Sequence, residues 1–401
     1  MNNTLGAIVF LPKDQSGALM LEKILFDPAA LWLSQTLQAA GLTQFLVVCH
    51  EDDREAAAAC FPAGAQFVTT GDTNAFETLS RFLERLEGNV LVFTAPVFLT
   101  DVGAQRLTGA ADLPRNMMGT GAFRVDAAAL KQALDEGAFD DFEAALQQTG
   151  QQYCEGADWS GRAVYRLESR LDVMDVQAVA RRLTVARLVR GGVRVIDPDS
   201  VYAGPDVTVG SGTVLLPGTI LRGKTVIGRD CEIGPNTMIR DCTVGERVSV
   251  NSSQLNESTV ESDTTIGPFA YVRPNCRVGA HVKVGDFVEL KNSNIGDETK
   301  ISHLTYVGDS DVGRHVNFGC GTVTVNYDGA AKFRTTIGDN AFIGCNTNLV
   351  APVKVGDGAY TAAGSTITDD VPADSLAIAR SVQTIKKQWA ARHRKKHAKS
   401  N

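Results

Sequence analysis

Aliphatic residues recur at every sixth position through the second half of the chain, beginning near residue 196. Glycine often follows the aliphatic residue directly, as in Ile227-Gly228 and Val355-Gly356. An α-helix repeats its faces about every 3.6 residues and a strand every second residue, so neither element explains this period. Three runs show it most clearly: Val209, Leu215, Leu221, Ile227, Ile233 and Ile239; Val260, Ile266, Val272, Val278, Val284 and Leu290; and Ile337, Ile343, Leu349, Val355, Thr361 and Ile367.

The period predicts a parallel β-helix, in which each hexapeptide forms a short strand and a turn. The inward aliphatic side chain of one coil stacks on its counterpart in the next coil, and we expect glycine or asparagine to take turn conformations with positive φ. The pattern resembles that of hexapeptide-repeat proteins. This resemblance, rather than the spacing, implies that the β-helix is left-handed.

The period is interrupted between Val323 and Ile337 by the stretch TVNYDGAAKFRTT, which carries Asn326, Tyr327 and Lys332. A loop that leaves the face of a solenoid can hold binding residues without disturbing the stacked core. A tolerated insertion without function is the alternative that the sequence leaves open.

The first half of the chain predicts an α/β domain with a parallel sheet. Four apolar runs suit buried strands: 6–11, 44–50, 65–70 and 88–95. Two stretches suit helices, 28–41 and 74–88, the second capped by Asn74. Ligands of such sheets bind at the carboxyl ends of the strands, but the first strand leads into LPKDQSGA without a glycine-rich phosphate-binding turn.

A connecting helix is predicted at 168–190, because acidic residues lie early in this stretch, arginines lie late, and Gly191-Gly192 follow. We expect Val173, Val176, Val179 and Leu183 to pack this helix against one of the domains. The expected organisation has four parts: an α/β domain at 1–165, the connecting helix at 166–192, the β-helix at 193–380 and a basic tail at 381–401.

Composition limits the classes of function. The 401 residues are 44% hydrophobic and 21% charged, which suits a folded protein. The net charge of -7 argues against nucleic acid as the main partner, although the tail from Lys386 holds seven lysines and arginines. We expect that tail to be a solvated, frayed end.

Eight cysteines are scattered without CxxC spacing, so the sequence predicts neither a zinc site nor a disulfide framework, and reduced thiols fit best. The stretch MNNTLGAIVFLPKDQ lacks a signal-peptide pattern, and no window reaches about 18 uninterrupted apolar residues. We therefore expect a cytoplasmic protein without membrane insertion.

Polar residues that are not typical of turns concentrate between residues 273 and 332. Each has an ordinary explanation by itself, since a single histidine is more often a surface residue than a catalyst. Together, cations and a neutral base suit an anionic substrate and a proton transfer. The set comprises Arg273, Glu289, Lys291, His303, Tyr306, Asn317, Asn326, Tyr327 and Lys332.

Four segments carry a more specific pattern: IGPFAYVRPNCRVGAHVKVGDFVELKNSNIG, ISHLTYVGDSDVGRHVNFGCGTVTVNYDGAAKF, IGCNTNLVAPVKVGDGAYTAAGSTIT and SLAIARSVQ. Through them the chain from about residue 165 to 390 resembles the acetyltransferase half of the bifunctional bacterial enzymes that make UDP-N-acetylglucosamine. Those enzymes pair an N-terminal uridylyltransferase with a C-terminal glucosamine-1-phosphate N-acetyltransferase. The resemblance implies N-acetylation of glucosamine-1-phosphate, with acetyl-CoA as co-substrate, in the synthesis of a cell-wall precursor.

Position by position, the family's general base falls on His303, whose imidazole suits the removal of a proton from an amine near neutral pH. The positions that match substrate-binding residues are Arg273, Lys291, Tyr306, Asn317, Asn326 and Lys332. Those that match acetyl-CoA-binding residues are Cys320, Asn326, Tyr327, Cys345, Ala363 and Arg380. The family commonly has alanine at the position of Cys320 and serine at that of Cys345, so we expect altered contacts rather than lost binding. Acetyl transfer is expected to need no metal.

The resemblance also implies a homotrimer whose site lies between neighbouring prisms and is completed by the C-terminal tail. The N-terminal half departs from the family, because GAIVFLPK lacks the phosphate loop and Ala95 takes the place of a metal-binding aspartate. The family's metal-binding asparagine falls near Met174 or Asp175. We therefore expect a degenerate, shortened nucleotidyltransferase-like domain of the Rossmann type that does not transfer uridylyl groups.

Two alternatives stay open. The first is a bifunctional enzyme that retains UTP-dependent uridylyl transfer with Mg²⁺. The second is a non-catalytic β-helix that serves as a scaffold or as a sensor of sugar nucleotides.

Overall fold

The computed structural model describes residues 6–14, 17–109, 119–136, 142, 146, 150–154 and 164–397. Packing divides the chain into two compact units, Met1–Thr225 and Val226–Asn401. Among the described helices, none combines the length and the apolar character needed to span a membrane. The four-part division expected from the sequence stays a prediction.

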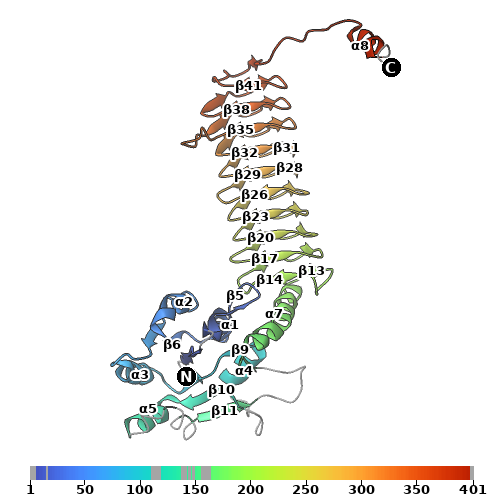
Figure 1. The fold of residues 1–401 in the computed structure, drawn as a ribbon. Coiled ribbons are helices and arrows are strands. Elements are labelled where there is room, and N and C mark those ends of the chain that lie inside the picture. Colours follow the sequence, from blue (N-terminus) through green and yellow to red (C-terminus); the bar gives the residue numbers. More distant parts are fainter. Residues whose placement is uncertain are drawn as a thin grey trace. The chain divides into compact units, whose positions relative to one another are not determined.

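A six-stranded sheet forms the centre of the first unit, in the order β11-β10-β8-β1-β6-β7. Figure 1 labels β6, β10 and β11 of this sheet. β1, β6, β7 and β8 run parallel, which confirms the four predicted strands. β10, which the sequence did not predict, runs antiparallel to β8 and β11, so the parallel sheet is extended by an antiparallel edge. The strand is hard to recognise in sequence because it begins with Gly-Thr-Gly, and glycine is depleted in strands. The bounds are β1 (Gly6–Phe10), β6 (Gln44–Cys49), β7 (Gln66–Thr69), β8 (Asn89–Phe93), β10 (Gly119–Asp126) and β11 (Gly150–Cys154).

The alternation of side chains along β1 builds one core on each face of this sheet. Ala7 and Val9 belong to a core that includes residues of α1 (Ala29–Ala39), α4 (Asp101–Thr108) and α7 (Arg170–Arg190). Ile8 belongs to the core on the other face, with residues of α3 (Ala75–Glu84) and α5 (Ala127–Asp135). Asn74 precedes α3 as predicted, and its backbone N–H donates to Asp72 Oδ1 at 2.9 Å.

Short elements complete the α/β part of this unit. They are the hairpin of β2 (Lys13–Asp14) and β3 (Gly17–Ala18), the pair β4 (Lys23–Ile24) and β5 (Asp27–Pro28), the pair β9 (Val97–Leu99) and β12 (Val164–Arg166), the single-turn 3₁₀ helices Leu19–Leu21 and Glu51–Asp53, and α2 (Arg54–Ala58).

The predicted connecting helix is α7, which begins two residues later than expected because Ser169 is its N-cap. Asp172 accepts hydrogen bonds from the backbone N–H groups of Glu168 and Ser169 at 2.9 and 2.8 Å, which lowers the pKa of this carboxyl. Val173 and Val176 are buried in the α/β core, with Val179 and Leu183 packed against it, as predicted.

The first coils of the β-helix belong to the same unit as α7. β13 (Arg194–Val195) pairs in parallel with β16 (Val214–Leu215), and β14 (Tyr202–Ala203) pairs with β17 (Ile220–Arg222). Between them lies β15 (Thr208–Val209). α7 packs on β13 and β14, so the helix contributes to both the α/β core and the beginning of the solenoid.

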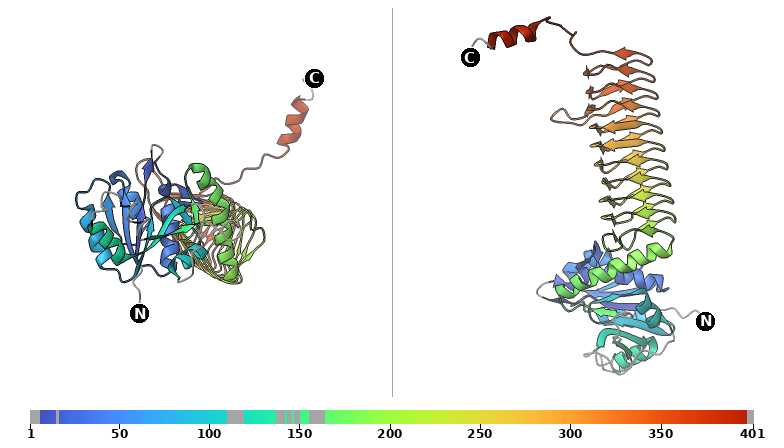
Figure 2. Two further views of the ribbon diagram at one scale, coloured as in Figure 1. Left: turned by 90° about the horizontal axis from the view of Figure 1, so that it is seen from below. Right: turned by 90° about the vertical axis from the view of Figure 1, so that its right-hand side faces the viewer.

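The second unit is a parallel β-helix whose coils stack in a regular series (Figure 2). Its strands fall into three sheets. Sheet I holds β19 (Glu232–Ile233), β22 (Ser249–Val250), β25 (Thr265–Ile266), β28 (Lys283–Asp286), β31 (Lys300–His303), β34 (Asn317–Phe318), β37 (Phe342–Ile343), β40 (Tyr360–Thr361) and β42 (Leu376–Ala377). Sheet II holds β20 (Met238–Arg240), β23 (Gln254–Asn256), β26 (Tyr271–Val272), β29 (Glu289–Lys291), β32 (Tyr306–Gly308), β35 (Val323–Val325), β38 (Asn348–Val350) and β41 (Thr366–Ile367). Sheet III holds β18 (Val226–Ile227), β21 (Thr243–Val244), β24 (Thr259–Val260), β27 (Arg277–Val278), β30 (Asn294–Ile295), β33 (Ser310–Val312), β36 (Thr335–Ile337) and β39 (Val353–Val355).

The six-residue aliphatic ladder forms the core of these coils, as predicted: Ile266, Val284 and Ile301 are fully buried. The expectation that glycine or asparagine takes positive φ in the turns is confirmed at positions such as Gly234 at 111° and Asn236 at 49°, although other residues such as Asp230 at 55° take it as well. Gly228 has a different role, because a Cβ there would lie only 2.5 Å from the carbonyl oxygen of Gly245 in the next coil. At this position glycine permits the close approach of coils.

The predicted loop leaves the stack between β35 and β36 (Figure 2). Beyond β42 the tail is exposed to solvent through Lys395, as expected, and it contains α8 (Trp389–His397). That its end is frayed stays a prediction, and residues 398–401 lie outside the described residues.

Candidate functional site

His303 ends β31 at the corner where sheet I turns toward sheet II. The register of β28 with β31 places Asp286 directly beside it, and His303 Nδ1 lies 2.5 Å from Asp286 Oδ1. This hydrogen bond lowers the pKa of the Asp286 carboxyl. Because a carboxylate only accepts, the bond assigns the proton to Nδ1 and leaves the lone pair on Nε2, the arrangement that a general base needs.

Three cations lie on sheet II and on the loop. β26 and β29 pair in a register that places Arg273 beside Lys291. Arg273 Nη1 donates to Glu289 Oε1 at 2.9 Å, and Lys291 Nζ lies 3.2 Å from Asp309 Oδ2. Lys332 reaches Lys291 from the loop: hydrogen bonding with Lys291, the charge of Lys291 and that of Arg273 lower the pKa of Lys332. Three cations with two carboxylates between them form a site suited to an anion.

Asp309 organises this group. Its carboxylate accepts from Asn292 Nδ2 at 2.6 Å, from Lys291 Nζ and from Asn326 Nδ2, and its side chain is 7% exposed. Burial alone would raise the pKa of Asp309, but these three donors outweigh it and hold the pKa below its usual value. One carboxylate thus fixes both Lys291 on sheet II and Asn326 at the start of the loop.

The loop folds back on itself so that Lys332 faces the site. Tyr327 and Lys332 form an antiparallel bridge, and the Asn326 carbonyl accepts from Phe333 N–H at 2.9 Å. Asp328 Oδ1 accepts from the N–H groups of Ala330 and Ala331 at 2.8 and 2.7 Å, which lowers the pKa of Asp328. The loop is therefore a hairpin held by its own hydrogen bonds, and it places Lys332 beside Lys291.

Tyr306 lies across Gly308, two residues further along β32. A Cβ at position 308 would lie 2.3 Å from the Tyr306 oxygen and 2.5 Å from Cζ, so this ring position requires glycine. The Tyr306 hydroxyl in turn lies 3.5 Å from Asn326 Nδ2. Tyr306 and Asn326 are thereby linked to Asp309, the carboxylate that also holds Lys291.

Small residues continue from His303 along the same corner into later coils. The registers of β31 with β34, β34 with β37 and β37 with β40 bring Cys320, Cys345 and Ala363 into line with His303. Arg380 follows, because its Cδ lies 3.8 Å from a Cβ placed on Gly364. The corner column, defined as His303, Cys320, Cys345, Ala363 and Arg380, gathers four of the predicted acetyl-CoA positions beside the predicted base.

Asn317 is the one predicted substrate-binding residue that does not lie near the others within a single chain. It lies on sheet I in register with Lys300, away from Tyr306 and Asn326 on sheet II. There it borders an open cavity of about 500 Å³ with His281, Glu298 and His315. Tyr327 lies on the loop, 55% exposed, and donates its hydroxyl hydrogen to the Gly329 carbonyl at 2.6 Å.

Sequence analysis missed Asp286 and Asp309. The coil period could have found Asp286, because it precedes His303 by one coil in the same column. Asp309 is harder to recognise, since it occupies a turn at φ 49° and has the sequence context of an ordinary turn residue. Within the described ranges, no group of three or more His, Cys, Asp or Glu side chains is arranged to hold a metal ion.

The strand ends of the α/β sheet have a different character. β1 leads into the β2–β3 hairpin, of which Gln15 and Ser16 lie outside the described residues. Lys13 on this hairpin lies 3.5 Å from Asp52 and 3.4 Å from Asp53. Beyond β8, Ala95 contacts Gly121, where a Cβ would lie 2.6 Å from that of Ala95. The Lys13 side chain is therefore paired with carboxylates, and the backbone of Gly121 lies close to Ala95.

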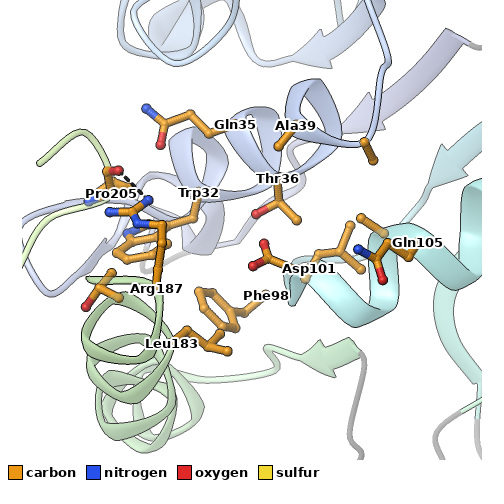
Figure 3. Close-up of a pocket in the computed structure, with 14 residues that line it drawn as sticks. Trp32, Gln35, Thr36, Ala39, Phe98, Asp101, Gln105, Leu183, Arg187 and Pro205 are labelled. Atoms are coloured by element: carbon orange, nitrogen blue, oxygen red, sulfur yellow. Dashed lines mark hydrogen bonds between the residues drawn. The ribbon is translucent and has the colours of Figure 1, made fainter. Parts of the chain in front are cut away.

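The first unit also has a cavity of about 340 Å³ between α1, α4 and α7 (Figure 3). Trp32 and Phe98 form its apolar wall, and Asp101 points into it from α4. Arg187 on α7 already donates to the Pro205 carbonyl at 2.8 Å; burial lowers its pKa, which the charges of Asp101 and Asp206 partly offset. Arg187 is the one cation among the described residues that line this cavity, and it is hydrogen-bonded to the backbone. The β-helix site differs, because three cations lie together there.

Comparison with known proteins gives results for the β-helix. The family described as bacterial transferase hexapeptide (six repeats) matches residues 257–292 and 334–369. Together with the three parallel sheets, it establishes the expected fold class, a left-handed parallel β-helix joined to an α/β unit. A protein named bifunctional protein GlmU from Clostridium acetobutylicum is 52% identical over 223 residues, 56% of this chain and 49% of that protein. One of the same name from Acetivibrio thermocellus is 54% identical over 56% of this chain and 48% of its own length.

The chain spans about half the length of the curated relatives it matches. Among solved structures, LpxA from Acinetobacter baumannii matches over 51% of this chain and 77% of its own, with 15% identity and a TM-score of 0.26. The bifunctional IspDF from Campylobacter jejuni matches over 40% and 51%, with 16% identity and a TM-score of 0.28. Superposition at this level adds nothing to the description of the site.

Proposed function

We propose that the protein transfers an acetyl group from acetyl-CoA to the amine of glucosamine-1-phosphate. The observation that carries this proposal is the place of the His303–Asp286 pair at the start of the corner column, where sheet I turns toward sheet II, the sheet that carries Arg273 and Lys291. An acetyltransferase for a phosphorylated amino sugar needs these three parts: a base, an anion site and room for an acyl carrier. The likeness to proteins named bifunctional protein GlmU supports the same conclusion.

His303 acts as the general base in this reaction. Nε2 accepts a proton from the amine while the nitrogen attacks the thioester carbonyl, the C–S bond breaks, and the thiolate of CoA leaves and takes up a proton. Asp286 holds Nδ1–H and stabilises the imidazolium that forms. Direct attack by the amine needs no enzyme nucleophile, so Cys320 and Cys345 take no part in bond making.

The phosphate binds between Arg273, Lys291 and Lys332. Lys332 is held beside two other cations, an unfavourable arrangement that a dianion relieves. Tyr306 and Asn326 position the sugar between this group and His303. Acetyl-CoA runs along the corner column, with its thioester at His303, its arm past Cys320, Cys345 and Ala363, and its phosphates near Arg380; Asn326 and Tyr327 contact it from the loop.

The active form is a homotrimer in which a second copy covers the corner beside His303. Phe269 and Phe287 are 59% and 57% exposed, their rings stack at 5.4 Å, and Leu304 continues the row next to His303. Exposed aromatic rings in such a row are typical of an interface. A neighbouring copy also supplies Asn317, which a single chain holds away from the site.

Subunit mixing tests this arrangement. His303→Ala and Asn317→Ala chains are each impaired alone, and co-assembled trimers regain up to about a quarter of the wild-type activity, because mixed trimers contain one site with both native residues. Sedimentation of each preparation measures the assembly. A full set of trimers without regained activity would place Asn317 and His303 in the same subunit's site.

We further propose that the α/β unit is a degenerate nucleotidyltransferase-like domain, retained for folding, assembly or regulation. At its strand ends Lys13 is paired with carboxylates, and the backbone of Gly121 lies close to Ala95. Two assays on one preparation decide the matter. Acetyl-CoA with glucosamine-1-phosphate releases free thiol, and UTP with N-acetylglucosamine-1-phosphate and Mg²⁺ yields no UDP-N-acetylglucosamine. Product in the second assay would establish a bifunctional enzyme, and ligand binding without thiol release would establish a non-catalytic sensor.

A further inference from the structure

The corner column contains two thiols for which the proposed acetyl transfer has no use. Gly319 N–H donates to the Ile343 carbonyl at 2.7 Å, and Asn346 N–H donates to the Cys320 carbonyl at 2.8 Å. These two bonds bracket Cys320 and Cys345 and make them direct neighbours in successive coils. In the single chain, Cys345 is exposed and Cys320 is half-buried.

The other described cysteine side chains belong to the core. The buried thiols, none of them in a disulfide, are those of Cys49, Cys60, Cys231, Cys242 and Cys276. Burial raises the pKa of Cys60 and that of Cys242 to about 11, and it also raises the pKa of Cys49 and Cys276. Since the thiolate is the reactive form, these buried thiols are slow to react and serve as internal controls.

We propose that Cys320 and Cys345 form a reversible disulfide that blocks the corner column. Neighbouring strands lie about 4.8 Å apart, within the range of about 4.4–6.8 Å between Cα atoms that a disulfide bridges. Parallel Cβ atoms at this spacing lie about 1 Å beyond the mean Cβ–Cβ distance of about 3.8 Å in disulfides, so the two side chains must lean together, and the resulting strain makes the bond easy to reduce. A labile disulfide of this kind suits a switch rather than a structural staple.

The oxidant is a low-molecular-weight disulfide such as oxidised glutathione. The thiolate of exposed Cys345 attacks one sulfur of glutathione disulfide, forming a mixed disulfide and releasing one glutathione thiolate. The thiolate of Cys320 then attacks the Cys345 sulfur and releases the second glutathione. Two protein thiols are oxidised with loss of two protons, and one glutathione disulfide is reduced to two glutathione molecules.

The consequence for activity rests on the proposed function. Cys320 and Cys345 lie one and two coils beyond His303 in the path assigned to the arm of acetyl-CoA. A disulfide draws the two side chains together along this path and removes two thiols from its surface. Oxidised protein therefore loses acetyl transfer, and bound acetyl-CoA slows the oxidation.

The chemical test uses the full chain and does not depend on activity. Protein is incubated with glutathione disulfide, alkylated and digested, and the peptides are identified by mass spectrometry. The expected result is a crosslink between the peptides of Cys320 and Cys345, reversed by dithiothreitol, with the buried cysteines unmodified. Glutathione adducts on one or both cysteines without the crosslink would overturn the proposal, as would equal reaction at Cys242.

The functional test compares each protein with its own reduced form. Oxidation lowers the wild-type rate of acetyl transfer at least about tenfold and dithiothreitol restores it, because the path of a substrate is closed. Cys345→Ser keeps an oxidised-to-reduced ratio near one, whatever its absolute rate, because it lacks the attacking thiol, whereas Cys320→Ala stops at the mixed disulfide of Cys345 with glutathione. A crosslinked wild type that retains its rate would overturn the switch but leave the acetyltransferase intact, whereas no thiol release in any reduced protein refutes the proposed function alone.

Discussion

The α/β unit and the β-helix each contain a histidine paired with an aspartate and a lysine paired with an aspartate. The pairs differ in whether a ring nitrogen or a positive charge remains available to bind a ligand. His50 Nδ1 accepts from the Asp52 backbone N–H at 3.3 Å, two residues away, and so caps a turn. His303 pairs instead with Asp286 of the preceding coil, which leaves Nε2 unbonded to Asp286 at the start of the corner column. A histidine that bonds its own turn has a local role, whereas one oriented by a distant carboxylate is ready for chemistry.

The lysines show the same contrast. Lys13 lies between two carboxylates, Asp52 and Asp53, so its charge is more than balanced. Lys291 shares Asp309 with two asparagine amides and has a second ammonium, that of Lys332, beside it. The ratio of cations to carboxylates, rather than the number of charged residues, thus distinguishes a surface ion pair from an anion site.

Removal of the histidine gives the largest expected difference between the units. His303→Ala lowers kcat for acetyl transfer by about 10²- to 10⁴-fold, since it removes the general base. His50→Ala, the matched change in the α/β unit, leaves kcat unchanged. Thiol release with both substrates saturating measures the effect, and equal rates for His303→Ala and wild type would refute the assignment of the base.

Removal of a lysine gives the next largest difference. Lys291→Met raises KM for glucosamine-1-phosphate about 10- to 100-fold, the loss expected for one charge-assisted hydrogen bond to the phosphate. Lys13→Met is the control and leaves that KM unchanged. KM for acetyl-CoA stays constant in both variants. A parallel rise in both KM values would indicate that Lys291→Met disturbs the fold rather than phosphate binding.

Changes at Asp286 have a smaller effect, because this positioning residue and His303 are 38% and 56% exposed and water screens their interaction. Asp286→Ala lowers kcat about fivefold with unchanged KM values, the upper range for an exposed ion pair. Asp286→Asn recovers part of this loss, since its amide oxygen still accepts from Nδ1–H. No difference between the alanine and asparagine variants would argue against orientation of the ring by this hydrogen bond.

The period of six was enough to predict the β-helix core, because stacked coils repeat one chemical environment at a fixed spacing. Periodicity could not reveal the pair of Cys320 and Cys345, because a loop lies between their coils and hides the alignment. The hydrogen bonds of Asp309 with Asn292 and Asn326 join residues one coil apart, but they depend on side-chain positions that the period of the aliphatic residues does not specify. The roles assigned to His303, Arg273 and Lys332 came from the resemblance to a known family. The structure adds their neighbours: Asp286 for His303, Glu289 for Arg273 and Lys291 for Lys332. β10 was not predicted, because its glycines lower the strand propensity of its sequence; the strand is stabilised by pairing with β8 and β11.

The smallest expected effect is a change in proton uptake when the anion site fills. In the free protein the neighbouring ammonium of Lys291 lowers the pKa of Lys332 below its usual 10.5, so part of Lys332 is neutral at alkaline pH. A phosphate dianion placed between the two reverses this shift, and Lys332 takes up a proton on binding. Uptake is therefore absent near neutral pH, where Lys332 is already charged, and grows as the pH rises toward the pKa of the free group.

Glucose-1-phosphate is the suitable probe, because it lacks an amine and its phosphate is fully ionised well above a pKa of about 6. Calorimetric titration at pH 7 and pH 9.5, in buffers of different ionisation enthalpy, gives the number of protons bound. We expect a fraction of one proton at pH 9.5 and none at pH 7 in the wild type. Lys332→Gln binds without uptake at either pH, and Lys13→Gln in the α/β unit behaves as wild type. Equal uptake in Lys332→Gln would assign the proton to another group and separate Lys332 from the phosphate site.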